Sequence, residues 1–259
     1  MAKALKRFLI SASLHDWGEP HGQSEPTVLL TSEETHHLKN VLRIQEGSLC
    51  LLLDPEGNEF ISRLERFRPD ARCEAKPLAA VSHRERFLQL TVAQAIPQDR
   101  KMDDIVQKAA ELGVSQLIPL ITERTVVRIK RDQFEKVRHR WERIAAQTLK
   151  QSRLQHTPRI GEMTMFGKLS SEGSQYERVY LLHPSEEARP IRTLFAKAIP
   201  EPRTTERVLL MIGPEGGFSP REVELAKENG AQLIRLGPGI LKTDTAFVAA
   251  VSFLKLMYE

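Results

Sequence analysis

Cysteine is scarce in this chain of 259 residues. Cys50 and Cys73 are the two present, and no pattern of metal-ligand spacing surrounds them. Two thiols are too few for a disulfide framework in a chain of this length, which excludes a disulfide-stapled secreted scaffold. The absence of ligand spacing also argues against a zinc site. We therefore expect two buried or half-buried thiols in a reducing compartment, and no bound metal.

Long apolar runs are also missing. The densest one, at 49–53, has the length of a strand and is far too short to span a bilayer. The first ten residues are basic and briefly apolar, without the hydrophobic stretch that a secretory signal needs. These absences predict a cytoplasmic protein that has no membrane partner. The composition, with 41% hydrophobic and 28% charged residues, is typical of a globular chain.

Positive charge is concentrated in one segment. The net charge is +4, but residues 128–153 contain nine Lys or Arg side chains against three acidic ones. A solvated helix face gives this pattern, and so does a surface that binds a polyanion such as RNA. The charge distribution alone leaves both interpretations open.

The first part of the chain, residues 1–78, reads as short strands between turns. A helix is expected at 32–42, with Ser32 as its N-cap. The turn cluster at 54–58 joins two strands into a predicted hairpin. Closely spaced strands of this kind favour a small β-barrel. The expected strands lie at 7–10, 27–30, 49–53 and 59–64.

The second part, residues 79–259, alternates strands with helices, which predicts an α/β domain with a mostly parallel sheet covered on both faces. Ser219, Pro220 and Glu222 form a capping box that opens one of the helices. Residues 167–175 read as an exposed loop. Strands are expected at 87–95, 116–120, 178–182, 207–212 and 232–236, and helices at 101–112, 133–151, 219–229 and 247–256.

Two glycine-rich loops follow strands in the second part. Residues 212–219 read Ile-Gly-Pro-Glu-Gly-Gly-Phe-Ser, and residues 236–246 read Leu-Gly-Pro-Gly-Ile-Leu-Lys-Thr-Asp-Thr-Ala. Ligands of open α/β sheets bind beyond the carboxyl ends of strands, where glycine lets the backbone approach them closely. Each loop alone is also explained as a tight turn or a helix cap. Two such loops after strands expected to be neighbours indicate one shared binding site.

These two loops resemble the signature loops of the SPOUT class of methyltransferases, and more narrowly the bacterial 16S ribosomal RNA uracil-N3 methyltransferase family. The resemblance implies a C-terminal SPOUT domain with a deep trefoil knot, a PUA-like N-terminal β-barrel and a homodimer. It also implies S-adenosyl-L-methionine as cofactor and the small ribosomal subunit as partner, with methyl transfer to ring N3 of one uridine. Further matching segments lie at 37–43, 101–114, 122–124, 151–152 and 182–184.

The resemblance and the chemistry together assign roles to residues. N3 of uracil carries a proton, so transfer needs a base or donors that stabilise the developing oxygen charge. Glu215 is the candidate base, or a structural acceptor of loop N–H groups, and Arg153, Lys242 and Arg124 are the candidate donors. Arg7, His37, Arg43, Lys101 and Arg153 are expected to bind RNA. The expected cofactor residues are Leu182, His183, Ile212, Gly213, Pro214, Glu215, Gly216, Leu236, Gly237, Ile240, Leu241, Thr243 and Thr245.

The second loop departs from the family pattern at three positions. Gly239 and Lys242 stand where the family usually has arginine, and Asp244 stands where it has glutamate. Lys242 keeps the charge but loses the bidentate fork of arginine. Two other hypotheses stay open: a related enzyme with a ribose hydroxyl or another base as acceptor, and a non-catalytic RNA-binding factor of ribosome assembly.

Overall fold

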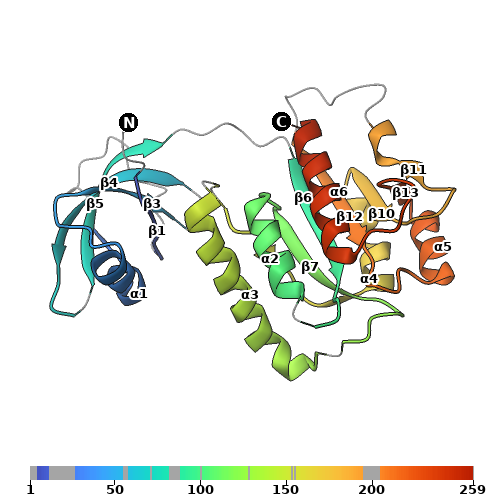
Figure 1. Cartoon of the computed structure of the whole chain (residues 1–259), viewed down its shortest axis with the longest axis horizontal. Helices are drawn as coiled ribbons and strands as arrows, with labels where there is room; N and C mark the ends of the chain where they lie inside the picture. Colours follow the sequence, from blue (N-terminus) through green and yellow to red (C-terminus); the bar gives the residue numbers. More distant parts are fainter. Residues whose placement is uncertain are drawn as a thin grey trace. The chain divides into compact units, whose positions relative to one another are not determined.

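The computed structural model describes residues 5–11, 27–54, 58–70, 72–81, 88–99, 101–127, 129–152, 154, 156–194 and 205–258. The chain divides into two compact units (Figure 1). The N-terminal unit comprises Met1–Arg84 together with Leu149–His156, and the C-terminal unit comprises Glu85–Thr148 and Thr157–Glu259. The predicted division at 78/79 did not include the return of residues 149–156 to the first unit.

The N-terminal unit is built on a curled sheet. Its described strands are β1 (Arg7–Leu9), β2 (Val28–Leu29), β3 (Leu49–Leu53), β4 (Glu59–Phe67) and β5 (Cys73–Val81), in the order β1-β3-β4-β5-β2. β3 and β4 pair antiparallel, which confirms the predicted hairpin. Apolar side chains on one face of this sheet form the core of the unit, among them Phe8, Phe60 and Leu64.

The helix of this unit differs from the prediction at both ends. α1 (Ser32–His36) is capped by Thr31, whose side chain accepts a hydrogen bond from the backbone N–H of Glu34, so the expected cap at Ser32 is wrong by one residue. A π-helical segment, η1 (His37–Val41), follows it. The segment is succeeded by Arg43 in a left-handed conformation with φ 52°, which a non-glycine residue rarely adopts.

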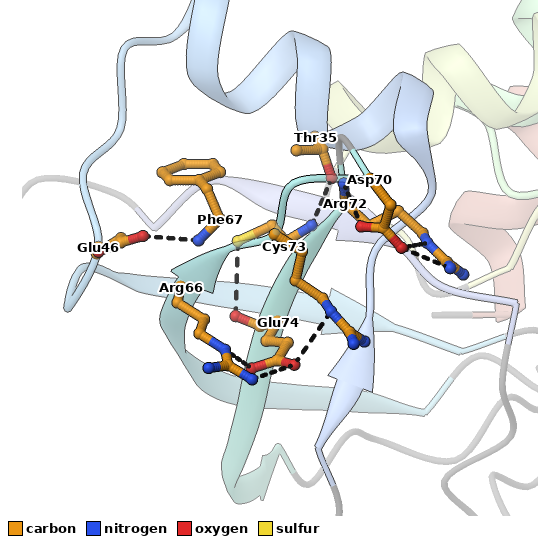
Figure 2. A network of polar contacts seen from close by, with 9 residues as sticks. Thr35, Glu46, Arg66, Phe67, Asp70, Arg72, Cys73 and Glu74 are labelled. Carbon is orange, nitrogen blue, oxygen red and sulfur yellow. Dashed lines mark hydrogen bonds and ion pairs between the residues drawn. The ribbon is translucent and has the colours of Figure 1, made fainter.

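Both cysteines lie in the core of the N-terminal unit and are free. Burial raises the pKa of Cys50 to about 12 and that of Cys73 to about 11. The backbone N–H of Cys73 donates to the Thr35 hydroxyl at 2.9 Å and so ties β5 to α1 (Figure 2). The predicted burial of the two thiols is confirmed. Because their pKa values are raised, we expect them to be unreactive and structural.

The C-terminal unit contains a larger sheet whose described strand pairs are parallel. Its order is β11-β13-β10-β12-β6-β7-β8, with β9 paired to β7. This arrangement confirms the predicted mostly parallel sheet. The strands are β6 (Leu88–Ala95), β7 (Gln116–Ile121), β8 (Arg159–Ile160), β9 (Thr164–Met165), β10 (Arg178–Leu182), β11 (Arg189–Pro190), β12 (Glu206–Ile212) and β13 (Gln232–Arg235).

Helices cover both faces of this sheet, because alternate side chains of its strands enter two separate cores. The first core contains residues of α2 (Lys101–Glu111), α3 (Arg131–Ser152) and α6 (Thr243–Tyr258). The second contains residues of α4 (Phe166–Ser171) and α5 (Pro220–Glu228). Figure 1 shows α2 and α6 side by side. Short 3₁₀ turns, η2 (Gly173–Gln175) and η3 (Ile191–Thr193), complete the described elements.

The loop expected at 167–175 is wrong. α4 and η2 occupy these residues, because Phe166 and Leu169 are one helical turn apart and are both buried in the second core. The capping box of α5 is confirmed: the Ser219 side chain accepts from the backbone of Glu222, and the Glu222 side chain accepts from the backbone of Ser219. In the described part of the chain, no helix is both long and apolar enough to cross a membrane.

Candidate active site at the strand ends

The carboxyl ends of three parallel strands lie side by side in the C-terminal unit. Leu182, the last residue of β10, pairs in register with Ile212, the last residue of β12, and with Ile234 of β13. The two glycine-rich loops therefore start at the same edge of the sheet. The sequence led us to expect neighbouring strands, whereas β10 lies between them and adds Leu182 and His183 to the same edge.

The first loop is closely packed at Gly213. A Cβ atom built there would lie 3.2 Å from both Cα and the carbonyl carbon of Gly217, so no larger residue fits without a shift of backbone. Gly217 itself has φ 68°, the left-handed region that favours glycine. The Thr243 hydroxyl at the start of α6 donates to the carbonyl oxygen of Gly213 at 3.4 Å. This contact joins the second loop to the first.

Glu215 at the tip of the first loop is held by a cation and a backbone donor. Its carboxylate accepts from Nζ of Lys101 at 2.9 Å and from the backbone N–H of Gln98 at 3.3 Å. Burial alone would raise the pKa of the Glu215 carboxyl, but the Lys101 hydrogen bond and backbone donors outweigh it and hold that pKa below its ordinary value. The hydrogen bond to Glu215 in turn raises the pKa of Lys101, an effect to which Asp99 and Asp244 add.

Arg124 holds the other side of the first loop. Its guanidinium donates to the carbonyl oxygen of Gly216 at 2.7 Å, and its stem lies 3.5 Å from where a Cβ of Gly216 would be. The buried Glu222 carboxylate reinforces this link, because it accepts from the backbone N–H of Glu123 at 2.9 Å. The segment after β7 is therefore fastened to the loop after β12.

His183 follows the last residue of β10 and has a buried ring nitrogen without a hydrogen-bond partner in the described structure. Its backbone N–H donates to Ile234 at 2.9 Å, whereas its Nδ1 and the Oγ of Ser185 are buried without a hydrogen-bond partner in the described structure. Burial lowers the pKa of His183, with Arg124 adding to the effect and Glu187 partly opposing it. The lowered pKa favours the neutral imidazole, whose buried Nδ1 is available to a ligand.

The second loop presents apolar side chains to the surface. Ile240 is 85% exposed and Leu241 is 43% exposed, whereas Leu236 is partly buried against the first core. Lys242 is exposed, and its carbonyl oxygen accepts from the backbone N–H of Ala246 at the start of α6. Ile240 and Leu241 therefore lie on a loop that is held at one end by the partly buried Leu236 and at the other by the first turn of α6.

The predicted residues fall into two groups. The expected cofactor residues, which include Glu215, belong to the C-terminal unit. The candidate donors Arg124 and Lys242 belong to the same unit. Lys101, which is paired with Glu215, also lies there. The RNA candidates His37 and Arg43 belong to the N-terminal unit, as does Arg7, and Arg153 lies outside the described residues.

The expected RNA-binding role of Arg7 stays a prediction. Its side chain is 7% exposed and forms an ion pair with Glu59, so its burial speaks against a direct contact with RNA. Sequence reasoning also missed Gln98 and Ser185, because a backbone donor and a buried hydroxyl leave no pattern in the sequence. Glu222 was recognised as a cap, but nothing in its spacing indicated the bond to Glu123. In the described residues, no group of His, Cys, Asp and Glu side chains is arranged to hold a metal ion.

Family models match both parts of the chain. One described as an RNA methyltransferase domain matches residues 84–255, and one described as an RNA methyltransferase PUA domain matches residues 30–68. The first match spans more than half of the sequence. The chain belongs to this family of RNA methyltransferases.

Named relatives are similar over most of the chain. The ribosomal RNA small subunit methyltransferase E of Bacillus subtilis is 28% identical over 237 residues, which are 92% of this chain and 93% of that protein. The Synechocystis protein of the same name is 30% identical over 236 residues, covering 91% of this chain and 75% of the relative.

Solved structures agree with the fold. The ribosomal RNA small subunit methyltransferase E of Neisseria gonorrhoeae, bound to S-adenosyl methionine, has a TM-score of 0.80 at 27% identity and covers 98% of both chains. A putative methyltransferase of Legionella pneumophila with bound cofactor SAM has a TM-score of 0.82, at the same identity and coverage. These likenesses confirm the predicted combination of an α/β methyltransferase domain with a PUA-like N-terminal domain.

Proposed function

We propose that this protein is an S-adenosylmethionine-dependent methyltransferase that modifies ring N3 of a specific uridine in 16S ribosomal RNA of the small subunit. The observation that carries the proposal is the register that aligns Leu182, Ile212 and Ile234 and so starts the two glycine-rich loops at the same edge of the sheet. The names of the Bacillus and Synechocystis relatives support the substrate class. We place the reaction in the cytoplasm, where ribosomal subunits are assembled.

The residues at the strand ends fit S-adenosylmethionine. The crowded backbone at Gly213 forms a fixed cradle, and His183 Nδ1 and Ser185 Oγ are polar atoms that a polar ligand would satisfy. When bound, this cofactor supplies a methyl group already activated on a sulfonium. The chain's own task is to bind and orient. The residues proposed for it are Leu182, His183, Ile212, Gly213, Pro214, Glu215, Gly216, Leu236, Gly237, Ile240, Leu241, Thr243 and Thr245.

Two further properties belong to the same proposal. The chain leaves β13 through residues 236–242 and enters α6, and we propose that this passage is threaded as a trefoil knot. The exposed side chains of Ile240, Leu241 and Leu256 form apolar surface on this passage and on α6. We propose a homodimer that covers exposed apolar groups of this kind, which mark an interaction site where they are contiguous.

The chemistry at N3 requires loss of a proton and stabilisation of the oxygen charge that develops on the uracil ring. We propose Lys242 and Arg153 for the stabilising role, since Lys242 is exposed beside the cofactor loops. Arg124 already donates to Gly216, and Glu215 is already paired with Lys101, so both are suited to holding the first loop. The role of Glu215 as the base stays a prediction, because its lowered pKa makes it a weaker proton acceptor.

Calorimetric titration with S-adenosylmethionine tests the cofactor. We expect saturable binding, and we expect Gly213→Ala to weaken it. An absence of binding heat at millimolar ligand would exclude both enzymatic hypotheses and leave the RNA-binding assembly factor.

Methyl transfer to small ribosomal subunits that lack the modification tests the acceptor. We expect label from tritiated S-adenosylmethionine to enter the RNA, and mass spectrometry of the nucleosides to show methylated uracil. Lys242→Ala and Arg153→Ala should lose turnover while cofactor affinity is retained. A methylated ribose, or another methylated base, would refute the uracil assignment while leaving the methyltransferase activity intact.

A further inference from the structure

A buried ion pair lies in the N-terminal unit, apart from the two glycine-rich loops in sequence. The Arg7 guanidinium contacts the Glu59 carboxylate at 2.5 Å, and the two side chains are 7% and 4% exposed. Buried charges are costly to desolvate and are retained only where they are paired and hydrogen-bonded. This pair therefore needs a structural or functional reason.

The pair lies on the sheet face opposite the unit's main core. β1 and β4 flank β3, and side chains alternate between the faces of a strand. Phe8 and Phe60 point into the main core, so their neighbours Arg7 and Glu59 point to the other face. Leu53 of β3 shares that face by the same alternation and is 1% exposed.

Leu149 and Leu154, from the segment Leu149–His156 of the same unit, contact Arg7 of the pair. Nη1 of Arg7 donates to the carbonyl oxygen of Leu154 at 2.5 Å and to that of Leu149 at 3.4 Å. Leu149 lies in the last turn of α3, where carbonyl groups lack donors within the helix. Arginine has enough donors in a rigid fork to serve a carboxylate and two carbonyls together.

We propose that Arg7 and Glu59 are positioning residues that fix the 149–156 segment on the N-terminal sheet. This inference rests on the proposed function, because the segment includes Gln151 and Ser152, which resemble a motif of the methyltransferase family, and Arg153, which we propose to stabilise the oxygen charge. Arg7 acts on the reaction through this segment. A guanidinium buried in this way meets an RNA phosphate only if it gives up Glu59 and the two carbonyls.

The exposed ion pairs of the same unit provide a matched control. Arg66 donates to Glu74 at 2.7 Å on the β4–β5 hairpin, but its side chain is 67% exposed (Figure 2). An exposed pair of this kind contributes little to structure. Arg66→Met removes the same charge from the same unit without touching the 149–156 segment.

Hydrogen exchange of the full-length protein tests the placement without any need for activity. In Arg7→Met and Glu59→Gln we expect faster amide exchange within 149–156 and unchanged exchange in the loops at 212–219 and 236–242. Arg66→Met should match wild type everywhere. Arg7→Lys keeps the charge but loses the fork, so its exchange should fall between wild type and Arg7→Met. It also serves as the measured variant if Arg7→Met fails to fold.

Kinetics then separates positioning from RNA contact. We expect kcat/KM on small ribosomal subunits to fall about a hundredfold in Arg7→Met, because a small misplacement of a catalytic group such as Arg153 is that costly. The Kd for S-adenosylmethionine should stay within about twofold of wild type, because the expected cofactor residues all belong to the other unit. Unchanged exchange at 149–156 would overturn the proposal, and so would a loss confined to salt-dependent RNA affinity. If wild type itself methylates no subunit, the proposed function fails while the exchange result still decides the role of Arg7.

Discussion

At the scale of single residues, the candidate site depends on a carboxylate and a cation from distant parts of the chain. Glu215 comes from the loop after β12, and Lys101 is the first residue of α2. The sequence pointed to both residues, but it assigned Lys101 to RNA and left Glu215 as either a base or a structural acceptor of loop N–H groups. Their pairing was not predictable, because 114 residues separate them and neither position has a periodic signal.

Lys101→Met should raise the pKa of Glu215 toward 4.5, its ordinary value. The folded-state pKa of Glu215 is lowered, so the stability linked to its carboxylate is complete above pH 4.5 and is lost as the pH falls through the lowered pKa. The difference in unfolding free energy between wild type and Lys101→Met should therefore shrink on acidification. NMR titration of the Glu215 carboxyl and denaturant unfolding between pH 3 and pH 7 measure the two effects.

Lys108→Met is the matched control for this experiment. Lys108 forms a comparable exposed pair with Glu111 on the same helix and lowers the pKa of that carboxyl. The control should move the pKa of Glu111 and leave Glu215 unaffected. A Glu215 pKa that is the same in Lys101→Met and wild type would contradict the assigned pairing.

Gly213→Ala should destabilise the protein by about 1–3 kcal/mol, the usual cost of overpacking. The added Cβ would lie 3.2 Å from backbone atoms of Gly217, which cannot rotate away. Gly239→Ala is the control, because a Cβ there meets nothing within 4 Å and the unfolded-chain effect of the substitution is the same. Urea unfolding compares them, and equal stabilities would show that Gly213 is not crowded.

At the scale of elements, α5 is fastened at its first turn. Ser219, Pro220 and Glu222 make the start of this helix readable from the sequence, because the capping box is a local pattern. The second oxygen of Glu222 reaches the backbone of Glu123, 99 residues away, which no local pattern indicates. The short elements were missed for a related reason: α4 is held by tertiary burial of Phe166 and Leu169 rather than by strong local signals.

Glu222→Ala should lower the free energy of unfolding by about 2–3 kcal/mol, since it removes the hydrogen bonds that two backbone N–H groups donate to a buried carboxylate. Glu224→Ala, which loses a surface pair with Lys227, should change it by less than about 1 kcal/mol. Thermal and urea unfolding give both values. Similar losses in the two variants would mean that the buried cap contributes no more than a surface charge.

At the scale of the whole molecule, the alternation of strands and helices was sufficient to predict a parallel sheet covered on both faces. The strand order was not predictable from it, because β10 is inserted between β12 and β13 by pairing distant in sequence. The signature loops predicted a site at this edge of the sheet, and the roles of its residues stay predictions. The return of residues 149–156 to the N-terminal unit escaped sequence reasoning, since a helix pattern does not show what its last turn packs against.

Leu256→Glu should convert the proposed homodimer into a monomer. Leu256 is 71% exposed on α6, and a charge buried in an apolar interface would be strongly unfavourable. Val126→Glu is the control. Val126 is 67% exposed, but it belongs to the connection between β7 and α3 in the sequence and not to α6. Light scattering after size-exclusion chromatography gives the mass of each variant. A wild type that is monomeric at micromolar concentration would refute the dimer.

The N-terminal unit is not one continuous stretch of chain, because it includes residues 149–156, which follow most of helix α3. Its strands come from positions before 85, but the segment on its Arg7 and Glu59 face comes from positions 149–156. A gene fusion that copied only the first 84 codons would carry a sheet with one face stripped of that segment. We therefore expect the two units to occur together in one gene rather than to be exchanged separately between proteins.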